Sequence, residues 1–321
     1  MSKADKIITK LYTDIIENGE TRPETRMFWK DGTPAYYRSV FGKQIIFKPE
    51  DGFPILTKKF VPFKSLSQEI LWIWQKQSNV VQDLRDMGSH VWDEWETEDG
   101  TIQKAYGWQL ANNFYDVAEE HISDEAKYKI NFDKIVNHRG FWRDGKAYIS
   151  LNQVEYVIQQ LIDNPYSRQI LTTLWKVSDL SEMSLQPCVY ETQWILINNK
   201  VDLIVRVRSN DEMLGAPYNI AQYSLLQRLI CQVTNRNVGN LIFQLGDCHI
   251  YDRHIELIEQ FIDNEEFDAP ELWIDPNVDK FEDFKFGENF KLINYKNGIG
   301  NAGALKTEVC VTKKELDRLN K

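Results

Sequence analysis

The sequence predicts an α+β fold, because helical and strand patterns are mixed along the chain without a regular strand–helix–strand repeat. Two stretches, residues 65–77 and 219–234, carry apolar side chains at helical spacing. Three others, residues 190–197, 200–208 and 241–245, have the composition of strands. The absence of strict alternation separates this pattern from that of a parallel α/β protein.

The two helical stretches are defined by apolar residues three or four positions apart, which share one face of a helix. In residues 65–77 these are Leu66, Ile70, Ile73 and Trp74. In residues 219–234 they are Leu226, Leu229, Ile230 and Val233. We therefore expect both helices to pack one apolar face against a core.

Residues 190–197 and 200–208 are expected to form a β-hairpin. Asn198 and Asn199 lie between them, and asparagine tolerates the positive φ angles of a tight hairpin turn. In the second strand the apolar positions are Val201, Leu203, Val205 and Val207, and they alternate with Asp202, Ile204, Arg206 and Arg208. Residues 241–245, LIFQL, are a further short apolar strand.

All 321 residues are expected to form one domain, residues 1–321, since no repeat, low-complexity tract or flexible linker divides them. Hydrophobic residues make up 42% of the chain, which is enough for a sizeable core. Acidic, basic and amide side chains cluster over residues 111–150, which therefore form a smaller, more exposed subregion.

The net charge of -10 disfavours a nucleic-acid-binding role, because an acidic surface repels phosphates. Small anionic substrates stay compatible with it, since they need only a few local cations. No apolar run is long enough to span a membrane, and residues 1–20 lack the apolar core of a signal peptide. We expect a cytoplasmic protein.

The four cysteines, Cys188, Cys231, Cys248 and Cys310, show neither metal-ligand spacing nor a disulfide framework. At least three are expected to be small buried side chains. Cys188 follows Pro187 and opens a strand, and a thiolate there becomes a good nucleophile if a nearby cation lowers its pKa. A buried structural thiol is the alternative reading.

Glu69 lies beside the apolar face of the first helix, where an unpaired carboxylate is costly. It is either a functional acid or base, or a partly exposed side chain whose head reaches water. Asn219 either serves a binding site or caps a helix N-terminus.

Arg208 and Ser209 offer a charged fork and a hydroxyl, which together suit a phosphate. The alternative is a solvated strand edge. His249 and Tyr251, in GDCHIYDRH, form either a hydrogen-bonding pair that faces a ligand or part of a packed turn.

Seven segments in a fixed order resemble the thymidylate synthase family over residues Asp31 to Val311. They are FGKQIIF with FPILTKK; QEILWIW; VWDEW with DG and YG after it; NPYSRQ; PCVYETQW; RSNDEMLGAPYNIAQYSLL; and LGDCHIYDRHIE. Each segment alone is a weak signal, but their order around one cysteine is specific. The resemblance implies a single-domain fold of the same kind, whose mixed sheet forms a homodimer interface.

The resemblance also implies the reaction, in which dUMP and 5,10-methylenetetrahydrofolate become dTMP and dihydrofolate. Cys188 corresponds to the nucleophile that adds to carbon 6 of the pyrimidine, which makes carbon 5 nucleophilic. Glu69 corresponds to the acid that acts through ordered water, and Tyr106 to the tyrosine that assists proton removal at carbon 5. Asn219 corresponds to the amide that reads uracil, and Asp211 to the carboxylate that binds the pterin.

Further residues carry over from the family as binding groups. Arg208 and Ser209 correspond to phosphate ligands, as does Arg168, which reaches the phosphate in the partner subunit. His249 and Tyr251 correspond to the pair that binds the 3'-hydroxyl. The folate group comprises Lys59, Trp92, Asp211 and Gly215. Folate and nucleotide are both substrates, and neither a metal nor a flavin is implied.

The sequence departs from the family pattern at several places near the phosphate. Gln169 replaces a second arginine, Val189 replaces a histidine after the nucleophile, and Val207 replaces a glutamine. Gly32 stands where a mobile phosphate-binding arginine is usual, and Arg26 is our candidate for its substitute.

The chain also continues past Val311, where family members commonly end, so residues 312–321 form a C-terminal extension. Their alternating charges favour a solvated helical tail. Residues 305–311 still resemble the segment that closes over the folate.

Two other functions compete with a synthase. A deoxyuridylate hydroxymethylase would add water to the same intermediate and yield 5-hydroxymethyl-dUMP and tetrahydrofolate, and Trp92 favours reduction over this outcome. A catalytically silent nucleotide- or RNA-binding homologue is the other alternative. Retention of Cys188, Glu69, Tyr106 and Asn219 argues against it.

Overall fold

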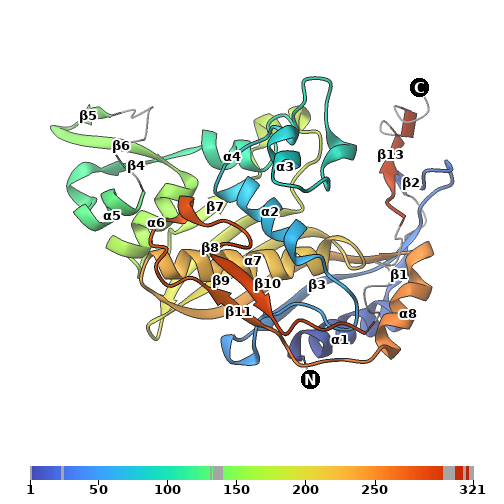
Figure 1. Cartoon of the computed structure of the whole chain (residues 1–321). Helices are drawn as coiled ribbons and strands as arrows, with labels where there is room; N and C mark the ends of the chain where they lie inside the picture. The colour runs from blue at the N-terminus through green and yellow to red at the C-terminus, as the bar shows by residue number, and fades with distance from the viewer. Residues whose placement is uncertain are drawn as a thin grey trace.

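The computed structural model describes residues 2–22, 25–130, 132, 140–298, 308–313 and 316–317. Its main element is a six-stranded sheet in the order β1-β3-β10-β9-β8-β7 (Figure 1). In that order the strands are Glu20–Thr21, Tyr37–Phe47, Asn237–Tyr251, Lys200–Asp211, Val189–Ile197 and Leu171–Thr173. β9 and β10 run parallel and the other neighbours antiparallel, so the sheet is mixed and the α+β prediction is confirmed.

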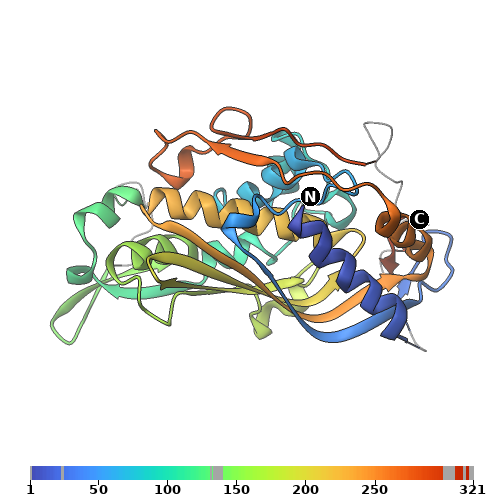
Figure 2. The ribbon, with the colours of Figure 1, turned by 90° about the horizontal axis from the view of Figure 1, so that it is seen from below.

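The helices gather on one face of this sheet and leave the other face bare (Figure 2). They are α1 Lys3–Asn18, α2 Phe63–Trp74, α3 Val81–Asp86, α4 Gly107–Asn112, α5 Asp124–Lys129, α6 Gln153–Asp163, α7 Gly215–Val233 and α8 Ile255–Asp263. On β9 the predicted alternation is confirmed, because Val201, Leu203, Val205 and Val207 are buried while the intervening side chains are only half-buried.

The core lies between the sheet and helices α2 and α7. Trp74 of α2 packs edge-on against Trp194 of β8 and against Tyr223 of α7, with ring centroids 6.2 and 6.4 Å apart. Tyr223 in turn meets Phe243 of β10. These contacts join four elements that are distant in the sequence, and they fix α7 across the inner face of the sheet.

Both predicted helices exist, but their ends differ from the expected ones. α2 ends at Trp74, three residues early, and Gln77 adopts a positive φ of 51° shortly afterwards. α7 begins at Gly215, four residues before the expected start. Pro217 is compatible with this because the first turn of a helix has no intrahelical acceptors for its N–H groups.

The predicted hairpin between β8 and β9 is confirmed, with Asn198 and Asn199 at φ 50° and 60°. The expected strand 241–245 is too short, because β10 runs from Asn237 to Tyr251. The residues at the C-terminal end of β10 are polar and lack strand alternation, because they are held by backbone pairing with β9 and β3 and do not form an apolar face. The alternative of a packed turn at His249 and Tyr251 is therefore wrong.

Three smaller sheets lie within the described residues. β4 Phe114–Ala118, β6 Lys146–Asn152 and β5 Phe141–Arg143 form one of them, at the side of the molecule in Figure 1. β11 Glu271–Ile274 pairs with β12 Phe290–Ile293, and β13 Val311–Thr312 with β2 Met27–Phe28. Of the subregion expected over 111–150, residues 131 and 133–139 lie outside the described residues.

The pairing of β13 with β2 sets residues 311–312 beside residues 27–28 (Figure 1). Arg253 joins the two segments, with its guanidinium 2.7 Å from Glu308 Oε2 and 2.7 Å from Asp31 Oδ2. Residues 313, 316 and 317 are helical, in keeping with the expected tail, but Thr312 lies in a strand and Leu316 is buried, so the described part of the tail is not fully solvated. Residues 305–307, 314, 315 and 318–321 lie outside the described part of the chain.

Candidate active site

The candidate site lies where the parallel strands β9 and β10 end. Their register sets Ser209 opposite Asp247 and Asp211 opposite His249. The chain then turns directly into α7, and Asp211 Oδ1 accepts hydrogen bonds from the backbone N–H groups of Met213 and Leu214 at 3.0 and 3.1 Å. Polar side chains from two strands and a helix start therefore meet at one edge of the sheet.

Cys188 immediately precedes β8 and is held to β9 by hydrogen bonds from Arg208. The Arg208 N–H donates to the Cys188 carbonyl at 3.0 Å. The Arg208 guanidinium donates to the carbonyls of Pro187 and Gln186 at 3.0 and 2.9 Å. β9 lies between β8 and β10, so the alternative of a solvated strand edge at Arg208 is wrong. Arg208 positions the loop that carries the thiol and sets a positive charge next to it.

The expected activation of Cys188 is only partly seen. Burial raises the pKa of its thiol, while the charge of Arg208 and a hydrogen bond with Tyr106 act in the opposite direction. Burial is the largest effect and Asp211 adds to it, so the net direction is upward, even though the cation that the sequence analysis looked for is present in Arg208. The other three cysteines are buried and unbridged, as expected.

The Tyr106 hydroxyl lies next to the nucleophile and accepts a hydrogen bond from the Cys188 backbone N–H at 3.1 Å. Its backbone is strained, with φ at +45° in a non-glycine residue. The next residue must be glycine, because a Cβ on Gly107 would lie 2.3 Å from the Ser78 carbonyl oxygen. The strain and the close approach together fix where the tyrosine side chain points.

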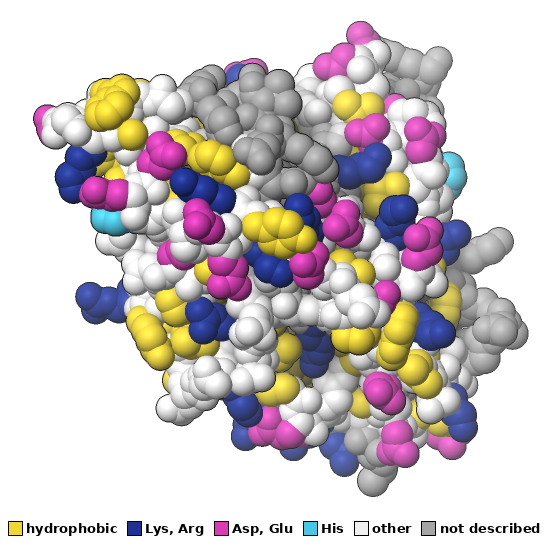
Figure 3. All heavy atoms as spheres, turned by 60° about the vertical axis from the view of Figure 1, so that its left-hand side comes forward, with side chains coloured by type: hydrophobic (Ala, Val, Ile, Leu, Met, Phe, Trp, Pro, Cys, Tyr) yellow, Lys and Arg dark blue, Asp and Glu magenta, His cyan; other side chains and the backbone are white. Residues whose placement is uncertain are grey.

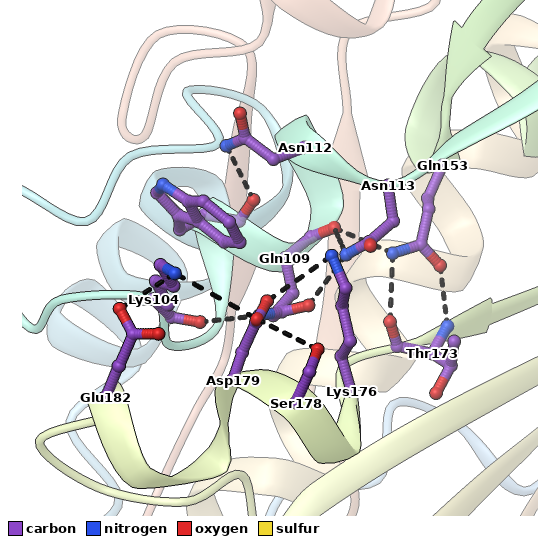
Figure 4. A network of polar contacts seen from close by, with 11 residues as sticks. Lys104, Gln109, Asn112, Asn113, Gln153, Thr173, Lys176, Ser178, Asp179 and Glu182 are labelled. Atoms are coloured by element: carbon purple, nitrogen blue, oxygen red, sulfur yellow. Dashed lines mark hydrogen bonds and ion pairs between the residues drawn. The ribbon is translucent and has the colours of Figure 1, made fainter.

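A polar network around Gln109 ties helix α4, which begins directly after Tyr106, to neighbouring segments (Figure 4). Gln109, fully buried on α4, donates to the Lys104 carbonyl at 2.8 Å and to Asp179 Oδ2 at 3.1 Å. Gln153 Nε2 donates to the carbonyls of Gln109 and Thr173 at 2.8 and 2.9 Å. Asp179 belongs to the short 3₁₀ helix Val177–Glu182, which leads toward Cys188, so the network ties the Tyr106 turn to the loop of the nucleophile.

Glu69 lies on α2 with both carboxylate oxygens hydrogen-bonded. Trp92 Nε1 donates to Oε1 and Gln222 Nε2 donates to Oε2, each at 2.8 Å. Burial raises the pKa of Glu69 to about 7, against the effect of these two hydrogen bonds. Glu69 is half-buried, and both of its carboxylate oxygens are already hydrogen-bonded to protein donors. The Trp92 ring packs edge-on against Tyr106 at 4.9 Å between centroids, so contacts run without a break from Cys188 to Glu69.

Asn219 lies inside α7, because that helix begins at Gly215, and the alternative of a helix cap is wrong. It is half-buried, and its Nδ2 atom is within 3.9 Å of the position that a Cβ of Gly215 would take. Gln222 follows Asn219 by three positions and so shares its helix face. That spacing was the only signal in the sequence for Gln222, which was not among the predicted site residues.

Lys59 lies near the start of α7, where its ammonium group donates a hydrogen bond to the Met213 carbonyl at 2.7 Å. Burial lowers the pKa of its ammonium group to about 8, while Asp211 opposes that shift. Lys59, Asp211 and Gly215, three of the expected folate residues, are therefore gathered around the turn into α7.

His249 and Tyr251 are buried near the end of β10 and pack edge-on at 5.1 Å between ring centroids. His249 Nδ1 lies 3.0 Å from Asp247 Oδ1, which fixes the orientation of the imidazole. Burial and contact with Cys310 raise the pKa of Tyr251, so its hydroxyl stays protonated and can donate a hydrogen bond.

The structure does not bring every expected residue into this cluster. Arg168 is exposed on the turn before β7, and Arg26 is exposed just before β2. Within the described residues, no group of three or more His, Cys, Asp or Glu side chains is arranged to hold a metal ion.

Glu212, which was not among the predicted site residues, is fully buried beside the site. Its Oε1 accepts a hydrogen bond from Asn210 Nδ2 at 2.7 Å. Burial raises the pKa of Glu212 to about 8, and the neighbouring charge of Asp211 adds to that shift. The folded protein therefore keeps this carboxyl protonated at neutral pH.

We expect the buried Glu212 to make folding less stable as the pH rises. A glutamate in the unfolded chain ionises near its ordinary pKa of 4.5, whereas the folded one keeps its proton up to about 8. Between these values the unfolded state binds fewer protons, so the free energy of unfolding falls with pH by up to about 1.4 kcal/mol per pH unit. Glu212→Gln should remove this contribution, and the variant should gain stability over the wild type from pH 5 to pH 8.

Urea unfolding at a fixed protein concentration over that pH range measures the difference. Glu17→Gln, at an exposed position of α1, is the control and should leave the pH dependence as in the wild type. A constant difference between Glu212→Gln and the wild type at every pH would show that Glu212 is ionised in the fold.

Comparison with known proteins gives consistent matches along the chain. The family model described as thymidylate synthase matches residues 6–309. A thymidylate synthase of Bacillus subtilis subsp. natto is 44% identical over 301 residues, which are 93% of this chain and 97% of that protein. The thymidylate synthase of Bacillus phage phi3T matches at 44% over the same shares. The solved structure of thermostable thymidylate synthase A from Bacillus subtilis superposes with a TM-score of 0.80 at 43% identity, covering 96% of this chain and 99% of that one.

Proposed function

Since this chain belongs to the thymidylate synthase family, we propose that it methylates dUMP to dTMP, with 5,10-methylenetetrahydrofolate as the co-substrate. The observation that carries this is the unbroken line of contacts from Cys188 through Tyr106 and Trp92 to Glu69. It joins a nucleophile, a hydroxyl and a half-buried carboxyl whose pKa burial raises to about 7. Such a carboxyl can both give and take a proton near neutral pH.

In this mechanism the Cys188 sulfur adds to carbon 6 of the pyrimidine, and carbon 5 attacks the methylene group of the folate. Glu69 exchanges protons with the substrates through water, and the Tyr106 hydroxyl assists removal of the proton from carbon 5. Arg208 next to Cys188 favours the thiolate at the moment of attack, since it offsets part of the cost of burial. Loss of the carbon 5 proton breaks the bond between the methylene group and the folate nitrogen, which releases tetrahydrofolate. Tetrahydrofolate then gives a hydride to the methylene group and becomes dihydrofolate, and Cys188 is expelled from carbon 6 to free dTMP.

The nucleotide is bound by residues that surround the ends of β9 and β10. Arg208 and Ser209 take the phosphate, with Arg168 from the partner subunit and Arg26 as further cations. His249 and Tyr251 bind the 3'-hydroxyl, which the fixed imidazole and the protonated phenol both suit. Lys59, Trp92, Asp211 and Gly215 bind the folate.

Two measurements test this function together. The wild type should release tritium from C5-labelled dUMP, and dihydrofolate absorbance should grow in step with chromatographically detected dTMP. Formation of 5-hydroxymethyl-dUMP and tetrahydrofolate without dihydrofolate would replace the synthase with a hydroxymethylase. Nucleotide binding without any tritium release would indicate a silent homologue.

Asn219→Asp is expected to shift the base preference from uracil toward cytosine. The amide can donate to O4 and accept from N3–H of uracil, whereas a protonated carboxyl presents the pattern that cytosine needs. Mispairing one buried polar contact costs about 1–3 kcal/mol, so kcat/KM for dUMP should fall roughly 5- to 150-fold relative to that for dCMP. An unchanged ratio of the two kcat/KM values would remove Asn219 from the base-reading role.

A homodimer through the bare sheet face is part of this proposal. The register aligns Gln193, Ile204, Ile242 and Ile46 in one row across four strands, and Ile46 is 40% exposed. In the neighbouring row Arg206 already bonds to Glu191, Gln193 and Gln244, so its charge is compensated within the subunit. Apolar side chains among paired polar ones are typical of a permanent interface.

The surface outside the site does not favour a polyanion as partner. On the face seen in Figure 3, acidic and basic side chains are interspersed without a continuous basic area. This agrees with the net charge of -10. None of the helices in the described ranges is both long and apolar enough to span a bilayer.

A further inference from the structure

We propose that Gln222 is a positioning residue, whose side-chain amide holds the Glu69 carboxylate in its working orientation and favours its ionised form. The inference rests on the proposed function, because it assigns a partner to the acid of that reaction. It also describes a property of the ligand-free protein, namely how Glu69 titrates.

The first argument is geometric. Gln222 Nε2 lies 2.8 Å from Glu69 Oε2 and 3.2 Å from the carbonyl oxygen of Leu66, one turn earlier on α2. Trp92 Nε1 holds the other oxygen at 2.8 Å. Donors from two different elements thus occupy both oxygens, and the carboxylate cannot rotate without losing one of the two bonds. Gln222 is only 3% exposed, so water cannot replace it directly.

The second argument concerns charge. The titratable groups that sense Glu69 are the hydroxyls of Tyr106, Tyr218 and Tyr223, all protonated because burial raises each pKa. In the described part of the chain, only the hydrogen bonds from Trp92 and Gln222 oppose the effect of burial on Glu69. Two neutral hydrogen-bond donors therefore stabilise the Glu69 carboxylate, a role that a lysine or arginine often has. Because no cation among the described residues adds to them, removing either donor should raise the pKa of Glu69.

The third argument comes from position. Gln222 and Asn219 share one face of α7, so a single helix carries the residue that reads the base and the residue that orients the acid. Gln227, five residues further on, offers a contrast. It is also fully buried, but its amide donates to the carbonyls of Val201 and Asn240 at 2.8 and 3.2 Å, away from Glu69.

The test compares Gln222→Met with Gln227→Met, two substitutions that remove a buried amide of the same size from the same helix. Protein with ¹³C-labelled glutamate carboxyl groups is titrated without ligands, and the Glu69 signal is assigned by its absence in Glu69→Gln. In Gln222→Met the midpoint should move upward by about one to two pH units, because a hydrogen bond to a carboxylate is lost. Gln227→Met should lower the unfolding midpoint in urea and leave the Glu69 titration in place.

Activity provides the second measurement. The pH profile of tritium release by Gln222→Met should move in the same direction as the carboxyl titration, while Gln227→Met keeps the wild-type profile. If Gln222→Met does not fold, Gln222→Glu serves instead. It sets a second carboxyl against Glu69, and the two should titrate as a coupled pair with one midpoint well above that of the wild type.

An unchanged Glu69 midpoint in the Gln222 variant, or equal shifts in the Gln222 and Gln227 variants, would overturn the proposal. Failure of the proposed function looks different. In that case the wild type releases no tritium from dUMP, whereas the titration of Glu69 can still be measured and still decides the role of Gln222.

Discussion

Cys188→Ala is expected to abolish tritium release from C5-labelled dUMP, with a loss on the order of 10⁴-fold or more. Without a sulfur to add at carbon 6, the pyrimidine carbon 5 is a poor nucleophile and cannot attack the methylene group. Binding should survive, because the phosphate and sugar contacts come from other residues. Calorimetric titration with dUMP measures that binding alongside the loss of turnover.

Cys231→Ala is the matched control for the nucleophile. Cys231 is buried on α7, where its thiol lies 3.8 Å from the Asn237 carbonyl oxygen, away from the nucleophile. Its substitution should lower stability and spare the chemistry, and the same expectation holds for Cys248 and Cys310. More than trace turnover by Cys188→Ala would contradict the mechanism, whatever the controls show.

The second large effect is the recovery of activity when two inactive proteins are mixed. Arg168→Ala lacks the arginine that is expected to reach the partner's phosphate, and Cys188→Ala lacks the nucleophile. In a heterodimer one site has both groups and the other has neither. With equal amounts and random exchange, half of the dimers are mixed, so about a quarter of the wild-type activity should return.

The exposure of Arg168 on the turn before β7 is compatible with such a reach, since its side chain is not buried within its own subunit. Subunit exchange must be verified first, for example by mass spectrometry of differently tagged subunits. Each variant incubated with itself is the control and should stay inactive. Confirmed exchange without recovery would argue that each site is built from one subunit only.

The fold was predictable where one apolar pattern covers a whole element. β9 and the hairpin at Asn198–Asn199 follow from alternation and turn chemistry, which are local properties. The end of β10 was not predictable, because the polar residues from Asp247 onward are held by pairing with β3 and β9. Helix ends at Gly215 and Trp74 were missed for a similar reason, since packing and backbone strain set them.

The sequence by itself determined the family and the chemical types at the site, because ordered motifs preserve residue identities along the chain. Only the tertiary structure decided how Glu69 is held and how far its pKa rises, since Gln222 lies 153 residues away in the chain. The same holds for the upward pKa of Cys188 and for the protonated Glu212. Burial and hydrogen bonding depend on which elements pack together in the fold, and the local periodicity of the sequence does not show which elements those are.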